Sequence, residues 1–172
     1  MGKAMRALES YPDRQYKELS SILGQTAIEV CEGQQLDMNF EHQNQVTVED
    51  YLSMITLKTA VLLGCSLQMG GICAGASKRD LEHLFLFGKH LGIAFQLLDD
   101  LLDCFPSGKG EFGKQVGGDI AANKKTFLWL KALELGSTAD KQELTAQAGS
   151  NDQSERIRNV TGIFRKLEID RL

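Results

Sequence analysis

Four polar side chains interrupt an otherwise apolar segment, GIAFQLLDDLLD, which runs from Gly92 to Asp103. They are Gln96, Asp99, Asp100 and Asp103, at positions i, i+3, i+4 and i+7. On an α-helix this spacing places all four side chains on one stripe. Carboxylates are the oxygen ligands that Mg²⁺ prefers, and Mg²⁺ commonly takes its remaining ligands from substrate phosphates. The stripe therefore predicts a divalent-metal site.

The solvated face of an amphipathic helix is the alternative for this stripe. Such faces usually mix acidic and basic residues, which form ion pairs at i, i+4, whereas this one holds three like charges. Gly88 and Gly92 extend the stripe toward the N-terminus. Each glycine inside a helix costs about 1 kcal/mol relative to alanine. We interpret that cost as one that a bound ligand must compensate.

Lysines follow the aspartates in a glycine-rich loop, FPSGKGEFGKQVGGD, at residues 105–119. The lysines in and just after this loop are Lys109, Lys114, Lys124 and Lys125. A solvated connector is one interpretation, but basic residues beside carboxylates favour a lid over an anionic ligand. The stretch GKGEFGK matches part of a P-loop pattern. Gln115 stands where that pattern needs Ser or Thr, and the preceding element is a helix, so we reject a P-loop.

Lys58 lies inside another apolar helical segment, MITLKTAVLLG. A surface lysine whose ammonium group reaches solvent is one interpretation. However, two helices joined near residues 76–77 would form an antiparallel hairpin, in which Lys58 lies roughly 27 Å and Asp99 roughly 33 Å from the turn. Lys58 and Thr59 are then expected to face the same cavity as Gln96 and Asp99. Lysines beside metal-binding carboxylates predict a diphosphate site.

The apolar periodicity predicts helices and no strand. Helices are expected over residues 13–34, 47–76, 77–104 and 120–136, the last with Gly136 as its C-cap. Thr47 and Ser77 are the expected N-caps, each with an aspartate three residues later, as in a capping box. The more polar tail keeps one apolar helical face, formed by Ile157, Val160, Phe164 and Leu167. We predict an all-α fold with one helical domain over residues 1–172.

Composition limits the class of protein. A chain of 172 residues that is 42% hydrophobic and 24% charged is expected to be globular. A net charge of -4 disfavours a nucleic-acid binder, because nothing in the total neutralises phosphates. The apolar run AVLLGCSLQMGGICAGA is broken by glycines and polar residues, so we expect a buried helix in a cytoplasmic protein rather than a membrane span. The cysteines, expected to be reduced and buried in the core, are Cys31, Cys65, Cys73 and Cys104.

The segments GIAFQLLDDLLD and GKQVGGDIAANKKTFLWL closely resemble the second aspartate-rich region of trans-type (head-to-tail) polyprenyl diphosphate synthases, which include farnesyl and geranylgeranyl diphosphate synthases. EGQQLD, at residues 32–37, and YLSMITLKTAVLL fit the same family in order and spacing. The resemblance covers residues 25–135. It implies an antiparallel helical bundle of the isoprenoid-synthase type.

The resemblance also implies roles for the metal-binding and diphosphate-binding residues. Asp99 would be the chief Mg²⁺ ligand, with Asp100 and Asp103 as secondary or water-mediated ligands. Lys58 and Lys114 would bind the allylic diphosphate. Mg²⁺ is the cofactor that this assignment requires.

Three more residues receive roles in the chemistry that the resemblance implies, the condensation of isopentenyl diphosphate with an allylic diphosphate. Thr59 and Gln96 would lie beside the developing allylic carbocation, and Lys124 would close over the site. Gln96 and Lys124 would both be substrate-binding residues. The implied catalytic residues are thus Lys58, Thr59, Gln96 and Asp99. Metal and lysines would stabilise the leaving diphosphate, while dry helical walls would protect the cation from water.

The chain departs from that family in its N-terminal part. Neither a first aspartate-rich motif nor the arginines that accompany it occur before Gln25, and family members usually continue past the helix that ends here at Leu172. We therefore expect a C-terminal or central portion of a longer synthase, without the N-terminal helices, that does not turn over alone. The resemblance implies a homodimer, and we expect no nucleic-acid partner and no stable membrane insertion.

Two hypotheses of other kinds stay open at this point. A non-catalytic helical subunit that regulates or scaffolds a full synthase predicts a tight partner, with little effect of Asp99→Ala on partner binding. A class I terpene cyclase is the other hypothesis. Those enzymes place a lone DDxxD motif differently and lack a segment like GKQVGGD.

Overall fold

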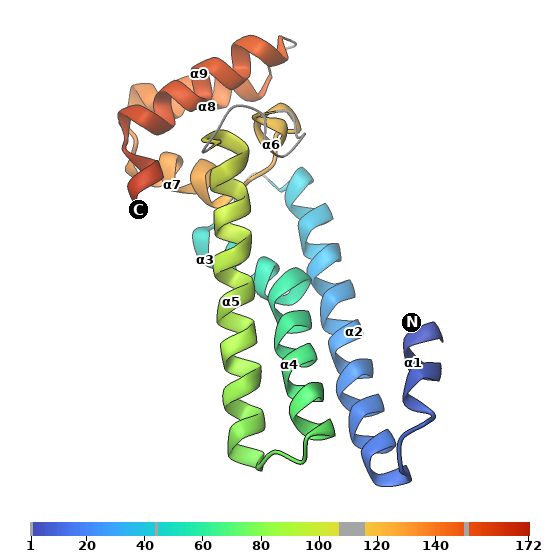
Figure 1. Ribbon diagram of the computed structural model, residues 1–172. Helices are drawn as coiled ribbons and strands as arrows, with labels where there is room; N and C mark the ends of the chain where they lie inside the picture. Colours follow the sequence, from blue (N-terminus) through green and yellow to red (C-terminus); the bar gives the residue numbers. More distant parts are fainter. Residues whose placement is uncertain (1, 44, 107–115, 150–151) are drawn as a thin grey trace. The chain divides into compact units, whose positions relative to one another are not determined.

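The computed structural model describes residues 2–43, 45–106, 116–149 and 152–172 (Figure 1). Every regular element in these ranges is helical, so the all-α prediction is confirmed for them. The α-helices are α1 (Gly2–Leu8), α2 (Asp13–His42), α3 (Val48–Ile55), α4 (Val61–Cys73), α5 (Lys78–Cys104), α6 (Gly118–Ala121), α7 (Phe127–Leu135), α8 (Thr138–Ala148) and α9 (Gln153–Lys166). A π-helix, η1 (Thr56–Ala60), joins α3 to α4, and a 3₁₀-helix, η2 (Ile169–Arg171), follows α9.

Both predicted N-caps are confirmed. The backbone N–H of Asp50 donates to Thr47 Oγ1 at 3.1 Å, and the backbone N–H of Thr47 donates to Asp50 Oδ2 at 2.9 Å. The backbone N–H of Asp80 donates to Ser77 Oγ at 3.2 Å. These bonds satisfy N–H groups that have no partner within the helix, which is why α3 and α5 begin at these positions. The predicted end of α5 at Cys104 is confirmed as well.

Two helix predictions need correction. The helix predicted over residues 13–34 does not end at Gln34 but continues, as α2, to His42. Residues 120–136 do not form one helix, because α6 ends at Ala121 and α7 begins only at Phe127. Asn123, between them, has a φ of 54°. Asparagine adopts this left-handed conformation more readily than most residues, and the apolar periodicity does not register such a break.

The cysteine prediction was also wrong in part. Cys65 and Cys104 are buried, but Cys31 and Cys73 are exposed. Burial raises the pKa of the Cys104 thiol to about 12, so this thiol stays protonated at neutral pH. The exposed pair shows that apolar neighbours in sequence do not ensure burial, since a helix turns one side of such a segment toward solvent.

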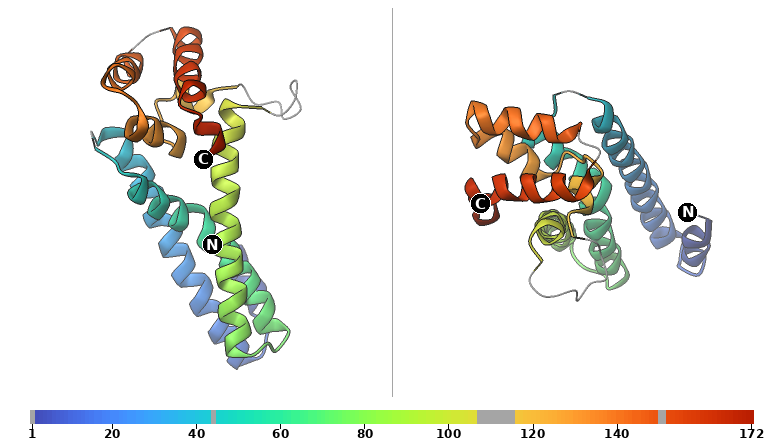
Figure 2. Two further views of the ribbon diagram at one scale, coloured as in Figure 1. Left: turned by 90° about the vertical axis from the view of Figure 1, so that its left-hand side faces the viewer. Right: turned by 90° about the horizontal axis from the view of Figure 1, so that it is seen from above.

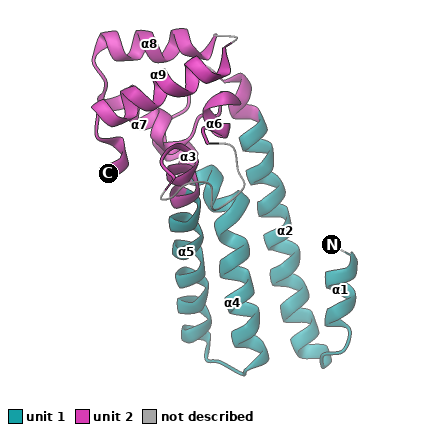
Figure 3. Ribbon diagram, turned by 45° about the horizontal axis from the view of Figure 1, so that its top comes forward, with its two compact units in different colours: residues 1–38, 53–96 teal, residues 39–52, 97–172 magenta. Residues whose placement is uncertain are grey.

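The chain forms two compact units, residues 1–38 with 53–96 and residues 39–52 with 97–172 (Figure 3). The prediction of a single domain stays a prediction. The first unit contains α1, η1, α4 and most of α2 and α5. Its core includes Leu8, Leu19, Ile72 and Leu81. The second unit contains most of α3 and all of α6 to α9, and its core includes Leu128, Leu144, Val160, Ile163 and Phe164.

The predicted hairpin of α4 and α5 lies in the first unit, and its two helices run antiparallel (Figure 2). A Cβ on Gly88 would lie 2.7 Å from the carbonyl oxygen of Leu63, and one on Gly92 would lie 2.6 Å from Cα of Ala60. The glycines therefore let two helix backbones approach closely. This packing accounts for both glycines, so the interpretation that a bound ligand must compensate for them was wrong.

Among the described residues, one helical run, Val48–Cys73, is long and apolar enough to cross a membrane. One such run is weak support for a membrane span, because the core helix of a soluble protein has the same length and composition. The run also contains Lys58, whose ammonium group pairs with Asp37. Charged residues are rare and costly inside a bilayer, so membrane insertion is not indicated.

Candidate functional site

The π-helix η1 presents two of the predicted residues, Lys58 and Thr59, in the first unit. The backbone N–H of Val61 donates to the carbonyl oxygen of Thr56, five residues back, which widens this turn. Such π-turns inside α-helices often occur at functional sites. Thr59 Oγ1 donates to Gln96 Oε1 at 3.3 Å, which confirms the predicted proximity of Thr59 and Gln96.

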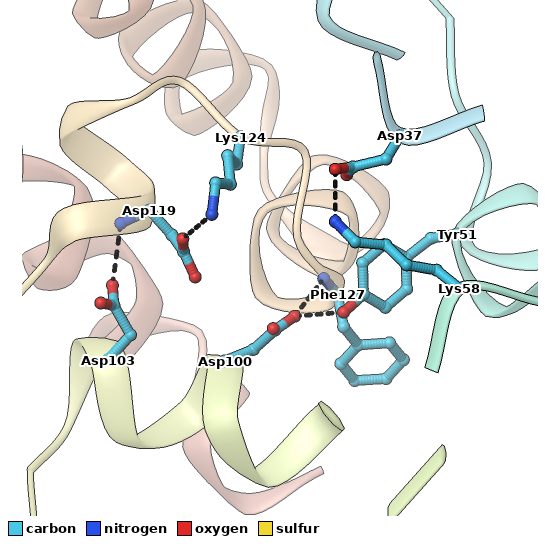
Figure 4. Close-up of polar contacts among 8 residues, drawn as sticks. All are labelled: Asp37, Tyr51, Lys58, Asp100, Asp103, Asp119, Lys124 and Phe127. Carbon is cyan, nitrogen blue, oxygen red and sulfur yellow. Dashed lines mark hydrogen bonds and ion pairs between the residues drawn. The ribbon is translucent and has the colours of Figure 1, made fainter. Parts of the chain in front are cut away.

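Lys58 pairs with a carboxylate that was not among the predicted site residues. Its Nζ donates to Asp37 Oδ2 at 2.5 Å (Figure 4). The side chains are 36% and 28% exposed, so solvent still reaches the pair. A Cβ on Gly33 would lie 2.3 Å from the backbone nitrogen of Lys58. Gly33 and Asp37, one turn apart on α2, thus provide the close approach and the charge that hold Lys58.

Asp100 is buried in the second unit and is 3% exposed. Its Oδ2 accepts hydrogen bonds from the Tyr51 hydroxyl and, at 3.4 Å, from the backbone N–H of Phe127 (Figure 4). Tyr51 belongs to α3 and Phe127 begins α7. One carboxylate therefore connects three helices. Burial of a carboxylate is costly unless hydrogen bonds satisfy it, and these two donors do so.

Asp103, one turn further along α5, receives bonds from the segment before α6. Its Oδ2 accepts from the backbone N–H of Asp119 at 3.0 Å, and its carbonyl oxygen accepts from Gly117 at 2.7 Å. Burial raises the pKa of Asp103, and the bond from Asp119 opposes that rise. Asp119 in turn accepts from Lys124 Nζ at 2.6 Å (Figure 4). Asp103, Asp119 and Lys124 thus form one polar chain.

Lys125 has a role different from that of its neighbour Lys124. Its Nζ donates to the carbonyl oxygen of Phe40 at 2.6 Å and to that of Gln43. An ammonium group at this position satisfies backbone carbonyl groups at the C-terminal end of α2, where the helix dipole favours a positive charge. Burial lowers the pKa of Lys125. The predicted lid lysines Lys109 and Lys114 lie outside the described residues, as does the whole of the rejected P-loop pattern.

The chemistry of the acidic side chains fits Mg²⁺ better than a softer metal, since all of them offer carboxylate oxygens. Within the described part of the chain, no three His, Cys, Asp or Glu side chains converge closely enough to hold a metal ion. Asp100 is already engaged by two donors, whereas Asp99 is only half-buried. Mg²⁺ usually needs only one or two carboxylates because water and substrate phosphates complete its coordination.

Sequence reasoning missed three residues that organise these contacts. Asp37 and Asp119 lie inside the quoted segments EGQQLD and GKQVGGD, but the sequence does not show which residues they contact. The spacing of Gly33 and Asp37 at i, i+4 was the available signal for Asp37, because it places both on one helix face. Tyr51 carries no comparable signal, since a buried tyrosine is ordinary in a helical core.

Comparisons with known proteins find similar sequences over most of the chain. A polyprenyl synthetase family model matches residues 1–164. The chain is 36% identical over 166 residues to a geranylgeranyl diphosphate synthase of Sulfolobus acidocaldarius, which covers 96% of this chain and 50% of the relative. It is 40% identical over 137 residues to a short chain isoprenyl diphosphate synthase of Methanothermobacter thermautotrophicus, which covers 80% of this chain and 42% of the relative.

Solved structures of similar proteins have the same fold. A crystal structure of a geranylgeranyl pyrophosphate synthase superposes with a TM-score of 0.87 at 42% identity, covering 98% of this chain and 53% of that one. A geranylgeranyl pyrophosphate synthetase from Pyrococcus horikoshii superposes with a TM-score of 0.86 at 30% identity, again covering 98% and 53%. The chain thus spans about half the length of the relatives that it matches.

Proposed function

Since the chain belongs to the polyprenyl synthetase family, we propose that it carries the Mg²⁺ and allylic-diphosphate half-site of a prenyltransferase. The reaction of the whole enzyme would condense isopentenyl diphosphate with an allylic diphosphate. The main support is the polar chain from Asp103 through Asp119 to Lys124, which begins one turn from Asp99 on the same helix face. The alternative of a non-catalytic scaffold is not favoured, because the relatives are named as synthases.

Asp99 is the residue that we assign as chief metal ligand, with Asp103 in a supporting role. Asp99 is half-buried and shares its helix face with Asp103. When bound, Mg²⁺ would stabilise negative charge on the diphosphate as it leaves. Asp100 also stays a predicted ligand, although its two hydrogen bonds give it a second task, that of joining α3 and α7 to α5.

Lys58 and Lys124 are assigned to the diphosphate oxygens, and each is already paired with an aspartate. Partly exposed ion pairs contribute only about 0–1 kcal/mol. Exchange of either carboxylate for a more highly charged diphosphate therefore costs little. The ammonium groups would then stabilise the electron pair that the diphosphate takes when the allylic C–O bond breaks. Lys114 is assigned to the same group, as the family resemblance implies.

Thr59 and Gln96 are assigned to the allylic cation that remains. Their oxygens meet at 3.3 Å, so two partial negative charges are fixed close together on η1 and α5. Oxygen dipoles oriented in advance stabilise a cation without the reorganisation that water would need. The double bond of isopentenyl diphosphate would attack this cation, and a proton would then leave the product. A cytoplasmic homodimer is the assembly that we propose for the whole enzyme.

Calorimetric titration with dimethylallyl S-thiolodiphosphate, with and without Mg²⁺, tests this proposal. Wild type is expected to bind only with Mg²⁺, and Asp99→Ala is expected to weaken binding by at least about tenfold, as loss of a ligand to the metal would. Glu82→Ala is the matched control, because Glu82 is an exposed acid on the same helix. Circular dichroism first establishes that each protein is helical. Binding that needs no Mg²⁺, or no binding by well-folded wild type, contradicts the proposal.

A further inference from the structure

The turn that carries Asp119 and Lys124 has little structure of its own to hold it. Its helix, α6, has only 4 residues. Gly117 on one side has a φ of 77°, and Asn123 on the other has a φ of 54°. So short a helix gains too few hydrogen bonds to offset the entropy of ordering it. Packing from another element must therefore fix the conformation of residues 117–124.

Helix α9 supplies that packing through Arg156, which is 7% exposed. Arg156 Nη1 donates to the carbonyl oxygen of Ala121 at 3.0 Å and to Oδ1 of Asn123 at 2.9 Å. The first bond satisfies a carbonyl group at the C-terminal end of α6, where a cation is favourable. The second holds the one non-glycine residue of this turn that has a left-handed backbone.

Ile157, the next residue of α9, contacts the other end of the same turn. A Cβ built on Gly117 would lie 2.6 Å from Ile157 Cγ2, so the isoleucine lies directly against the glycine backbone. Gly117 also donates to the carbonyl oxygen of Asp103 at 2.7 Å. Two consecutive residues of α9 therefore contact the two ends of the turn, Arg156 through hydrogen bonds and Ile157 through apolar contact.

Hydrogen bonds within the turn connect the contacts from α9 to Asp119 and Lys124. Besides the bond between their side chains, the backbone N–H of Lys124 donates to the carbonyl oxygen of Asp119 at 3.0 Å. The backbone N–H of Asp119 donates to Asp103 at 3.0 Å. Since Asn123 directly precedes Lys124, a change in its backbone conformation would redirect the chain that carries the lysine.

We propose that Arg156 is a positioning residue for Mg²⁺–diphosphate binding, acting through Ala121 and Asn123 to hold Asp119 and Lys124 against Asp103. The ligand part of this role rests on the proposed function. The positioning part concerns the ligand-free chain and can be measured separately. Loss of a buried, charge-assisted hydrogen bond is expected to loosen the turn measurably.

Hydrogen exchange of the ligand-free chain tests the positioning part. Arg156→Met keeps most of the apolar stem and removes the donors. The amides of Asp119, Asn123 and Lys124 are expected to exchange about tenfold faster in this variant, since local opening becomes easier. Arg158→Met is the matched control, because Arg158 is exposed on the same helix. Equal exchange in Arg156→Met and wild type would overturn the proposal.

A second variant serves if Arg156→Met loses its helical circular dichroism. Asn123→Gly tolerates the left-handed backbone and removes the side chain that carries the Oδ1 acceptor. Exchange of Lys124 is expected to rise about threefold, because one of the two bonds from Arg156 remains. Unchanged exchange in Asn123→Gly would likewise overturn the proposal.

A double-mutant cycle with inorganic diphosphate and Mg²⁺ tests the ligand part. Arg156→Met is expected to weaken binding about tenfold alone, but less than about twofold when added to Lys124→Met, because it acts through Lys124. Fully additive effects would show that Arg156 contributes by another route and would overturn its positioning role. A third outcome would separate the two parts of the proposal: Arg156→Met exchanges faster, but the wild type binds no diphosphate. That result would refute the proposed function, and the stabilisation of the turn by α9 would still be established.

Discussion

Lys58 and Thr59, in the first unit, stand on a helical turn that glycine contacts bring close to neighbouring helices. Asp119 and Lys124, in the second unit, stand on a short irregular turn that α9 holds from outside. The position of Lys58 and Thr59 depends on the close approach of helix backbones. The position of Asp119 and Lys124 depends on a few side-chain contacts. The first arrangement is therefore sensitive to added volume, whereas the second is sensitive to lost hydrogen bonds.

The largest effect is expected from Gly33→Ala, which tests the close approach in the first unit. The new Cβ would lie 2.3 Å from the backbone nitrogen of Lys58, and a backbone atom cannot move aside easily. We expect a loss of about 2–3 kcal/mol in the free energy of unfolding, measured by urea titration. Gly24→Ala on the same helix is the control, with nothing within 4 Å of its Cβ, and a gain of up to about 1 kcal/mol is expected there. Equal stability of the two variants would refute the close-packing explanation.

A somewhat smaller loss is expected from Tyr51→Phe, which removes a hydrogen bond in the second unit without adding volume. Asp100 loses a donor while it stays buried, which costs about 1–2 kcal/mol in the free energy of unfolding. Tyr16→Phe is the control, because Tyr16 packs among apolar side chains of the first unit. The urea midpoints of both variants give the answer, and a neutral Tyr51→Phe would mean that Asp100 does not need this donor.

Asp37→Asn is expected to change stability by no more than about 0.5 kcal/mol, because its ion pair with Lys58 is partly exposed. Affinity for Mg²⁺ with inorganic diphosphate should nevertheless rise about threefold, since the carboxylate no longer competes for the ammonium group. Calorimetry measures this change. Weaker binding by the variant would show that Asp37 positions Lys58 rather than competing with the ligand.

The smallest effect, confined to acidic pH, concerns Asp140, which forms the capping box of α8 with the N-cap residue Ser137. Hydrogen bonds from Lys166 and then Ser137 hold the pKa of Asp140 at about 2, below its ordinary 3.8. The unfolded chain thus binds this proton more tightly, so the stabilisation is complete above about pH 4 and is lost as the pH falls toward 2. The urea midpoints of wild type and Asp140→Asn should converge over that window. A difference that stays constant into acid would contradict the assignment.

The sequence predicted most of what regular helices determine. The caps at Thr47 and Ser77, the end of α5 at Cys104 and the meeting of Thr59 with Gln96 followed from side-chain chemistry and helical periodicity. These features depend on residues close in sequence, or on the fixed rise per residue that sets which positions of two paired helices lie at the same level.

Tertiary contacts determined what the sequence did not predict. The stripe on α5 showed which side chains share a face, but not that Tyr51 and Phe127 cover Asp100. At the break, Asn123 accepts a hydrogen bond from Arg156, which is distant in sequence, and no local pattern joins the two. The sequence shows that the helical glycines lower helix stability, but not that they allow close contact with the backbone of another helix.

The most direct test of a metal–diphosphate site on α5 uses Mn²⁺ in place of Mg²⁺, with inorganic diphosphate, in an amide NMR spectrum. A paramagnetic ion broadens the signals of the amides nearest to it. We predict the strongest broadening at Asp99, Asp103 and Asp119, only when diphosphate is present, and its loss in Asp99→Asn. Broadening centred on other residues, or undiminished in Asp99→Asn, would contradict a metal site at this end of α5.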